Sequence, residues 1–296
     1  PAASFTAQVA GLSVAVDGSG STDSDGAVAG HAWTWGDGTA PGSGATATHT
    51  YAEAGSYTVT LTVTDEEGAT ASATRTVTVA APDGPAQPQV LAADAFQRSV
   101  TGGLGTADAG GGWTVLMGAA RQAVTGGAAV LTVGPGNNAG SHLADVAATE
   151  VDLRTTVSFS RTPANGTGAY AYVTGRRVGT AQYKARVRVL PTGEVGVSLV
   201  REVGGVETTL GFVTLPGLTY TPDLPLQVHL RVTGTGTTDL ELTVWRAGDP
   251  EPTVPTLARA DATAALQAPG SVGLAAYLSG SSSSPVAVRF DDLQVT

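Results

Sequence analysis

The 296 residues include no cysteine, which excludes disulfides, thiol nucleophiles and thiolate zinc sites, and at roughly 100–200 residues per domain they predict two domains. Fifteen basic residues stand against 25 acidic ones, and no basic stripe exists for a phosphate backbone to follow, so we expect no nucleic acid partner. No apolar run reaches the roughly 18 residues of a membrane span, so we expect no membrane insertion, and we expect a monomer.

Short runs that alternate apolar and polar residues fill the first 80 positions. They lie at residues 13–16, 31–35, 45–51, 56–65 and 73–80. About six or seven strands in so short a stretch predict a small immunoglobulin-like β-sandwich over residues 1–81. Trp33 and Trp35 alternate onto one face as core residues, and Gly36 and Gly38 make a tight turn that needs positive φ.

A specific constellation lies within this first module. The stretch HAWTWGDG at residues 31–38 is followed at fixed spacing by Tyr51, Gly55, Tyr57, Val59, Leu61, Val63, Asp65 and Gly68. It resembles the polycystic kidney disease (PKD) domain, an immunoglobulin-like sandwich common in bacterial exoenzymes and surface layers. The resemblance covers nearly all of residues 1–80 and implies a module that spaces or presents its neighbours.

The same resemblance implies a calcium loop, since some members of the family carry calcium. Asp23 and Asp25 lie two positions apart in the loop at residues 19–26, and alternating carboxylates in a turn can chelate an oxygen-preferring cation. The alternative is a solvated turn held by hydrogen bonds from the aspartate side chains to nearby backbone groups.

A break follows at residues 81–89, where APDGPAQPQ contains three prolines, one glycine and no apolar periodicity. Such a composition is typical of a short, semi-rigid connection. We therefore predict a Pro-rich linker over residues 82–91.

The rest of the chain, residues 92–296, contains about eleven or more alternating runs with turns every 8–15 residues or so and no long helical period. This pattern predicts a large double-sheet jelly roll. The stretch at residues 94–114, the many strands and the closing VRFDDLQVT at 288–296 resemble the concanavalin-like, laminin-G-like jelly rolls of actinobacterial secreted proteins. The predicted fold class is all-β, a small immunoglobulin-like sandwich followed by a larger concanavalin-like jelly-roll sandwich.

The two ends of this second module should lie on adjacent strands, which would bring Asp94 near Asp291 and Asp292. In related jelly rolls such a terminal carboxylate pair often holds structural calcium, so the resemblance implies Asp94 and Asp292 as ligands. The alternative is that these carboxylates cap strand ends and contact Arg98 or Arg289.

Strand alternation leaves aromatic and basic side chains on the faces opposite the core. Aromatic rings stack on the C–H faces of pyranose rings, and guanidinium groups donate planar hydrogen bonds to hydroxyls or pair with uronate and sulfate groups. We therefore predict a carbohydrate site, on the condition that these strands share one sheet; on two outer faces they would be ordinary exposed residues. The candidate residues are Tyr170, Tyr172, Arg186, Arg188, His229, Arg231, Trp245 and Tyr277.

No catalytic residues are predicted. Glu150 and Asp152 match the first two positions of the Glu-x-Asp-x-Glu set of jelly-roll glucanases, but Arg154 stands at the third, so the strand lacks the second carboxylate of glycoside hydrolysis. The four histidines have no zinc-binding spacing.

These observations predict a non-catalytic, lectin-like accessory region of a secreted or cell-surface bacterial protein. Its jelly roll would bind a polysaccharide or cell-surface glycan, the PKD-like module would act as a spacer, and calcium would fix loops. Two alternatives stay open. One is a structural or adhesive surface spacer that binds a protein partner or none, and the weaker one is a polysaccharide hydrolase or lyase.

Overall fold

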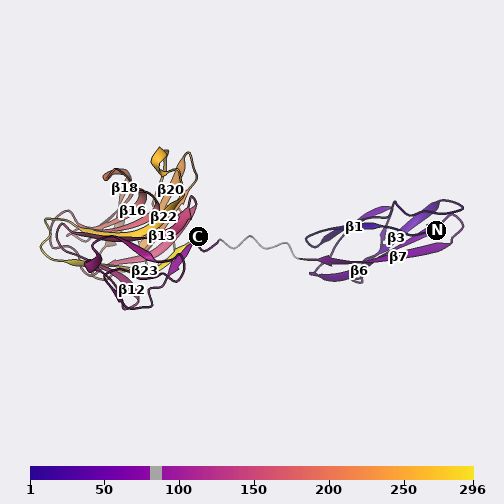
Figure 1. Ribbon diagram of the computed structural model, residues 1–296, viewed down its shortest axis with the longest axis horizontal. Coiled ribbons are helices and arrows are strands. Elements are labelled where there is room, and N and C mark those ends of the chain that lie inside the picture. Colours follow the sequence, from indigo (N-terminus) through magenta and orange to yellow (C-terminus); the bar gives the residue numbers. More distant parts are fainter. Residues whose placement is uncertain (81–88) are drawn as a thin grey trace. The chain divides into compact units, whose positions relative to one another are not determined.

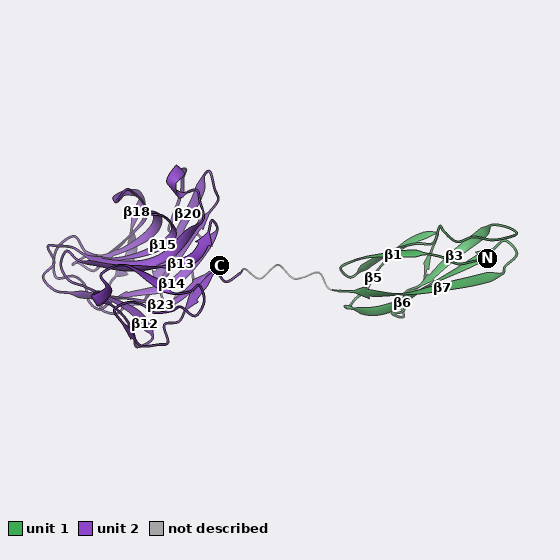
Figure 2. Cartoon of the chain, viewed as in Figure 1, with its two compact units in different colours: residues 1–87 green, residues 88–296 purple. Residues whose placement is uncertain are grey.

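The structure is a computed structural model that describes residues 1–80 and 89–296, and the chain divides into two compact units, residues 1–87 and 88–296 (Figures 1 and 2). Residues 82–88 of the expected linker lie outside the described part. In the described residues the elements are strands and two short 3-10 turns, so the all-β prediction is confirmed. No helix there is long and apolar enough to cross a membrane.

The N-terminal unit is a sandwich of two antiparallel sheets. One sheet has the order β1-β2-β5 and the other the order β4-β3-β6-β7. The strands are β1 (Thr6–Ala10), β2 (Ser13–Asp17), β3 (Val28–Thr34), β4 (Gly42–Ser43), β5 (Thr46–Thr50), β6 (Gly55–Asp65) and β7 (Thr70–Val79).

Tryptophan side chains fill the core between these sheets, as the alternation predicts. Trp33 is fully buried and Trp35 nearly so, and their rings stack in parallel with centroids 6.3 Å apart. The turn after them requires glycine, because Gly36 has φ +83° and a Cβ there would lie 2.6 Å from the carbonyl oxygen of Thr58. The predicted core residues and turn are therefore confirmed.

The C-terminal unit is a larger sandwich of two antiparallel sheets. A seven-stranded sheet has the order β10-β13-β22-β15-β16-β17-β18, and a nine-stranded sheet has the order β21-β20-β19-β14-β23-β12-β11-β9, with β8 paired to β23. The elements are β8 (Ala92–Asp94), β9 (Val100–Thr101), β10 (Trp113–Met117), η1 (Ala119–Arg121), β11 (Gln122–Thr125), β12 (Ala128–Val133), β13 (Asn138–Ala148), β14 (Val151–Phe159), β15 (Ala169–Val178), β16 (Ala181–Val189), β17 (Glu194–Val203), β18 (Val206–Thr219), β19 (Leu226–Thr233), β20 (Thr238–Arg246), β21 (Leu257–Asp261), η2 (Ala264–Leu266), β22 (Gly270–Leu278) and β23 (Val286–Val295).

Strict alternation builds the core of this unit. In β14, buried and half-buried residues alternate over the whole strand, and the inward side chains of both sheets join one apolar cluster. Two-residue periodicity is what a half-buried strand requires, because successive side chains point to opposite faces. The outward faces are therefore well defined wherever the ladder is regular.

Strand β15 departs from strict alternation, and this irregularity determines which side chains face the candidate site. In β15, Thr174 pairs with Lys184 and Arg176 with the adjacent Tyr183, so Gly175 is an extra residue in the ladder. A Cβ on Gly175 would lie 2.6 Å from a methyl carbon of Val232, so the bulge requires glycine. After the bulge, Arg176 points into the interior with none of its surface exposed, and Arg177 lies on the outer face.

Candidate functional site

The predicted carbohydrate-binding residues lie on two different sheets. One group belongs to the seven-stranded sheet and the other to the nine-stranded sheet, so the eight residues do not form a single patch. The first group is Tyr170 and Tyr172 of β15, Arg186 and Arg188 of β16 and Tyr277 of β22; the second is His229 and Arg231 of β19 and Trp245 of β20.

Three tyrosines of the seven-stranded sheet lie together. The rings of Tyr170 and Tyr172 are nearly parallel with centroids 6.3 Å apart, and Tyr277 lies 5.6 Å from Tyr170 across the ladder. Tyr170 is buried and its hydroxyl donates to the carbonyl oxygen of Thr167. Tyr170 therefore supports the other two rings, which are half-buried.

A cavity of about 420 Å³ opens beside Tyr172 and Tyr277. Its base is formed by small residues of adjacent strands, since Gly140 pairs with Ala275, and Ala275 pairs with Tyr172. A Cβ on Gly140 would lie 2.9 Å from the Cβ of Ala275, so these two small residues leave space beside the ring of Tyr172. The polar side chains around it include His142, Thr174, Arg177, Gln182, Lys184, Glu202 and Glu207.

Lys184 organises one end of this cavity. Its Nζ lies 2.6 Å from carboxylate oxygens of both Glu202 and Glu207, and 4.5 Å from the ring centroid of Tyr172. Burial raises the pKa of the Tyr172 hydroxyl well above its usual value, so the group stays a neutral phenol. The phenol can therefore both donate and accept hydrogen bonds.

His142 and Arg177 lie at another part of the cavity wall. Nδ1 of His142 lies 2.8 Å from the hydroxyl of Ser271, and burial, followed by the charge of Arg177, lowers the pKa of the imidazole. The ring is thus neutral at pH 7. Sequence alternation did not identify either residue as part of the site, although the glycine inside the run VTGRRV at 173–178 is the local signal of a bulge.

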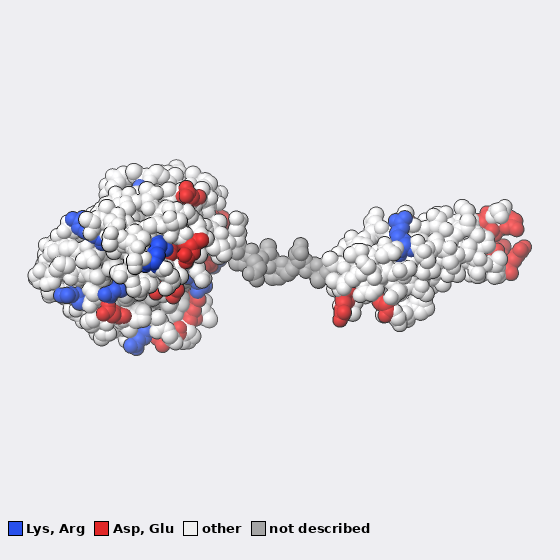
Figure 3. All heavy atoms as spheres, turned by 60° about the horizontal axis from the view of Figure 1, so that its bottom comes forward, with Lys and Arg blue, Asp and Glu red and all other residues white. Residues whose placement is uncertain are grey.

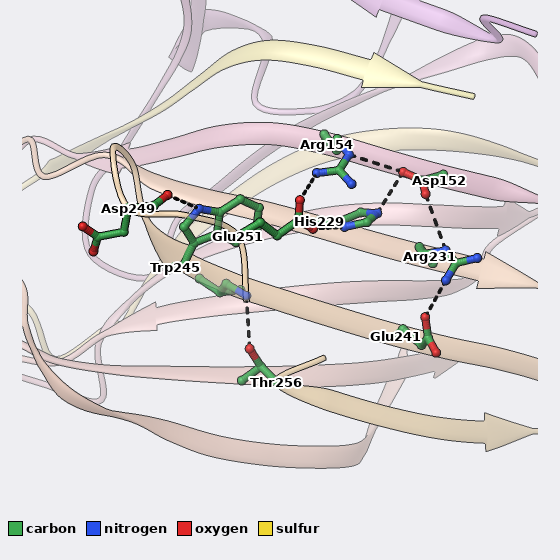
Figure 4. A network of polar contacts seen from close by, with 10 residues as sticks. Asp152, Arg154, His229, Arg231, Glu241, Trp245, Asp249, Glu251 and Thr256 are labelled. Carbon is green, nitrogen blue, oxygen red and sulfur yellow. Dashed lines mark hydrogen bonds and ion pairs between the residues drawn. The ribbon is translucent and has the colours of Figure 1, made fainter. Parts of the chain in front are cut away.

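The second group of predicted binding residues, His229, Arg231 and Trp245, lies in a polar network on the nine-stranded sheet (Figure 4). The two ring nitrogens of His229 contact Asp152 (2.8 Å) and Glu251 (2.6 Å). Arg154 pairs with Glu251 at 2.6 Å, and Arg231 pairs with Glu241 at 2.9 Å. Trp245 belongs to the same region and donates from Nε1 to the carbonyl oxygen of Asp249 (3.2 Å). These groups bind one another, and they connect the segment at residues 247–256 to the sheet.

This network predicts a pH-dependent contribution to stability. Burial alone would lower the pKa of His229, but its contacts with Asp152 and Glu251 outweigh burial and raise it. A raised folded-state pKa stabilises the protein below the unfolded value of about 6.5, and the gain is lost as pH rises through the folded pKa. The pKa of Asp152 is lowered, chiefly by His229, so its contribution is lost as pH falls through the carboxyl range. We therefore expect His229→Gln to lower the free energy of unfolding by about 1–3 kcal/mol near pH 5–6, and by less above pH 8.

Urea unfolding of the protein and the variant across this pH range measures the difference. His142→Gln is the control, because the lowered pKa of His142 gives a pH dependence of the opposite sign. A difference between the protein and His229→Gln that stays constant with pH would contradict the assignment.

One of the two candidate calcium ligands of the jelly roll, Asp94, is bonded to protein groups. The chain ends are adjacent as expected, since Asp94 pairs with Leu293. The Asp94 carboxylate is buried and accepts from both terminal nitrogens of Arg98 at 2.7 Å and from Nε1 of Trp113 at 2.8 Å. Asp292 lies at φ +49° and is exposed. Asp94 therefore makes the contact with Arg98 that was the alternative to calcium.

The candidate loop of the N-terminal unit likewise shows local hydrogen bonds. Asp23 accepts from the backbone N–H of Ser24 (2.9 Å), and the Ser24 hydroxyl donates to Asp25 (3.4 Å). Across residues 1–80 and 89–296, no three His, Cys, Asp or Glu side chains are grouped so as to hold a metal ion.

Charged residues of both signs occur on the surface of the C-terminal unit (Figure 3). On the face drawn in Figure 3, basic and acidic side chains of the C-terminal unit are interspersed, without a continuous basic stripe. This agrees with the composition of the sequence.

Known proteins are similar to residues 1–80 of the N-terminal unit. A sequence model of the PKD domain matches residues 1–80. The PKD1 domain of Epp from Vibrio anguillarum is 42% identical, over 27% of this chain and 93% of that one, with a TM-score of 0.26. Through residues 1–80, the chain belongs to the PKD domain family. The PKD1 domain of the Vibrio cholerae metalloprotease PrtV is 41% identical, over 27% of this chain and 96% of that one, with a TM-score of 0.26.

Solved structures of low sequence identity also match a larger share of the chain. The carbohydrate binding module CBM66 from Bacillus subtilis is 14% identical, over 66% of this chain and 96% of that one, with a TM-score of 0.40. No curated protein matches the chain. The C-terminal unit is a jelly-roll sandwich of two antiparallel sheets.

Proposed function

We propose that the C-terminal unit binds a polysaccharide or cell-surface glycan on the outer face of its seven-stranded sheet, with the PKD domain as a spacer in a secreted or cell-surface protein. One observation carries this proposal. Tyr172 and Tyr277 border a cavity of about 420 Å³ whose base is glycine and alanine and whose walls combine apolar and polar side chains. This volume lies in the range of about 300–1,000 Å³ that is usual for small-molecule sites.

The chemistry of the walls suits a sugar. A pyranose ring presents C–H groups on its faces and hydroxyls at its edge, so it needs aromatic surface together with donors and acceptors. Tyr172 and Tyr277 supply the rings, and His142, Gln182 and the carboxylate of Glu202 supply donors and acceptors. The seven-stranded face is favoured as the site because two tyrosine rings border its cavity, whereas Trp245 is the one aromatic candidate residue on the nine-stranded sheet.

Binding is favoured over hydrolysis. Glycoside hydrolysis needs one carboxylic acid that gives a proton and a second carboxylate that acts as base or nucleophile. Glu202 and Glu207 are the carboxylates of this cavity, and both are salt-bridged to the single ammonium of Lys184. Both carboxylates are therefore engaged by the same ammonium, and the cavity does not present one carboxyl group as a proton donor beside a second, unpaired carboxylate.

The proposal is tested by retention of the protein on a panel of insoluble and gel-embedded polysaccharides. We expect retention on one glycan class and a loss of about tenfold or more in affinity for Tyr172→Ala, because a tenfold change corresponds to about 1.4 kcal/mol and the ring provides stacking area. Tyr172→Phe keeps the ring and should stay within about threefold of the original affinity.

Trp245→Ala is the matched control, since it removes an aromatic ring from the nine-stranded sheet. It should leave retention unchanged. Equal losses for Trp245→Ala and Tyr172→Ala would move the site away from the seven-stranded face. No retention on any glycan would favour the structural spacer.

A further inference from the structure

Arg177 is an unusual member of the cavity wall. Among the residues that the structure describes, it makes no ion pair within 4.0 Å and no side-chain hydrogen bond, although it is half-buried. The other basic side chain of the cavity, Lys184, has two carboxylates on its Nζ. A guanidinium carries five N–H donors in a planar fork, so Arg177 brings a full set of donors to the cavity wall.

The surroundings of Arg177 are arranged by neighbouring strands. In the ladder it pairs with Gln182 of β16 and with Ser271 of β22. The Ser271 hydroxyl contacts Nδ1 of His142, which leaves Nε2 of that neutral ring for another partner. Gln182 binds Thr174 and Glu202 through its side-chain amide. The side chains of Arg177 and His142 therefore both line the cavity, and among the described residues no carboxylate pairs with Arg177.

The bulge at Gly175 creates this arrangement. Without the extra residue, alternation from Tyr172 and Thr174 would turn Arg176 outward and Arg177 into the core. With it, Arg176 binds four acceptors inside the unit, and Arg177 faces the cavity. The two consecutive arginines thus have opposite surroundings, and within the described residues only the first has protein acceptors.

We propose that the cavity binds an acidic sugar residue whose carboxylate or sulfate group pairs with Arg177. The inference rests on the proposed function and specifies the class of glycan. The planar fork of arginine matches two oxygens of a carboxylate or sulfate, and such charge-assisted pairs are about twice as strong as neutral hydrogen bonds. A neutral sugar would leave this half-buried guanidinium without an oppositely charged partner.

The formal net charge of −10 opposes an acidic ligand only weakly at this place. At physiological ionic strength, exposed charges more than about 8–10 Å apart are largely screened. The carboxylates of the cavity, Glu202 and Glu207, share the ammonium of Lys184, and Glu207 also pairs with Arg186, so these two negative charges lie beside two positive ones. The charge of Arg177 and its near neighbours, and not the net charge of the chain, therefore decides whether an acidic sugar can pair with Arg177.

Paired polysaccharides test the inference on the full chain by affinity gel electrophoresis. The first pair is polygalacturonate and its fully methyl-esterified form, and the second is dextran sulfate and dextran. The two members of a pair share a backbone, so the first pair tests recognition of a carboxylate and the second tests recognition of a sulfate. We expect binding to an acidic member at least tenfold tighter than to its neutral partner. Arg177→Gln should remove that preference, and Arg177→Lys should keep part of it.

Arg246→Gln is the control, because it removes one positive charge from the end of β20 in the other sheet. It should leave the preference unchanged. Equal binding of acidic and neutral partners, or a preference that persists in Arg177→Gln, overturns the inference while the proposed function stands. Binding to the neutral polysaccharides alone likewise overturns the inference and leaves the proposed function standing. No binding to any polysaccharide of the panel overturns both the inference and the proposed function. Urea unfolding of Arg177→Gln confirms that the variant is folded.

Discussion

Replacement of Arg176 by methionine is expected to lower the free energy of unfolding of the C-terminal unit by about 3–5 kcal/mol, among the largest effects of a single substitution. The side chain is fully buried. Its Nη1 donates to the Thr238 hydroxyl (2.9 Å) and the Leu266 carbonyl oxygen (3.0 Å), and its Nη2 donates to the carbonyl oxygens of Gly234 (3.1 Å) and Thr149. Each buried acceptor that loses its donor costs about 1–3 kcal/mol.

The acceptors explain why the effect should extend beyond one contact. They lie in the turn before β14, the turn after β19, the start of β20 and the 3-10 turn η2, so one guanidinium joins segments that are far apart in the sequence. Methionine fills a similar volume but donates nothing. The loss should therefore come from polar groups and not from a cavity.

Urea unfolding followed by circular dichroism measures this difference. Arg177→Met is the matched control, since it makes the same chemical change at the adjacent position, where the guanidinium has no partner among the described residues, and we expect a change within about 0.5 kcal/mol. Similar losses in the two variants would show that the buried hydrogen bonds of Arg176 contribute little.

Periodicity in the sequence is sufficient to predict the architecture. Alternation places Trp33 and Trp35 in the core of the PKD domain, and the motif around these two residues is enough to indicate the family. The same rule predicts a second, larger β-sandwich. These inferences succeed because the inward or outward direction of a side chain depends on local sequence alone.

Which strands share a sheet depends on contacts that are remote in sequence, and here the predictions reach their limit. Tyr172 and Trp245 both point outward as expected, yet they belong to opposite sheets. The bulge at Gly175 exchanges the faces of Arg176 and Arg177, which strict alternation assigns the other way. Similarly, Asp94 is adjacent to the last strand as predicted, but Arg98, four residues away, occupies its carboxylate.

Replacement of Trp33 by alanine is expected to unfold the PKD domain or bring it close to unfolding. Trp33 has no exposed surface, its Nε1 donates to the carbonyl oxygen of Gly44 (2.8 Å), and the ring of Phe5 meets it edge-on at 5.1 Å. The neighbouring strand end is fitted to the ring, because a Cβ on Gly18 would lie 3.1 Å from it. Truncation of a buried tryptophan costs about 3–5 kcal/mol, against a total stability of roughly 4–12 kcal/mol for a domain of this size.

Thermal unfolding monitored by near-ultraviolet circular dichroism tests this expectation, with Trp33→Phe as the control that keeps an aromatic ring and loses only the hydrogen bond and part of the contact area. We expect the alanine variant to lose the transition of the PKD domain or shift it downward by more than about 10 °C, since about 1 kcal/mol corresponds to roughly 4–8 °C in so small a domain. Glycan retention should survive in the same variant, because a spacer contributes no contact to the ligand. If retention disappears together with the fold of the PKD domain, that domain takes part in binding and its assignment as a spacer is wrong.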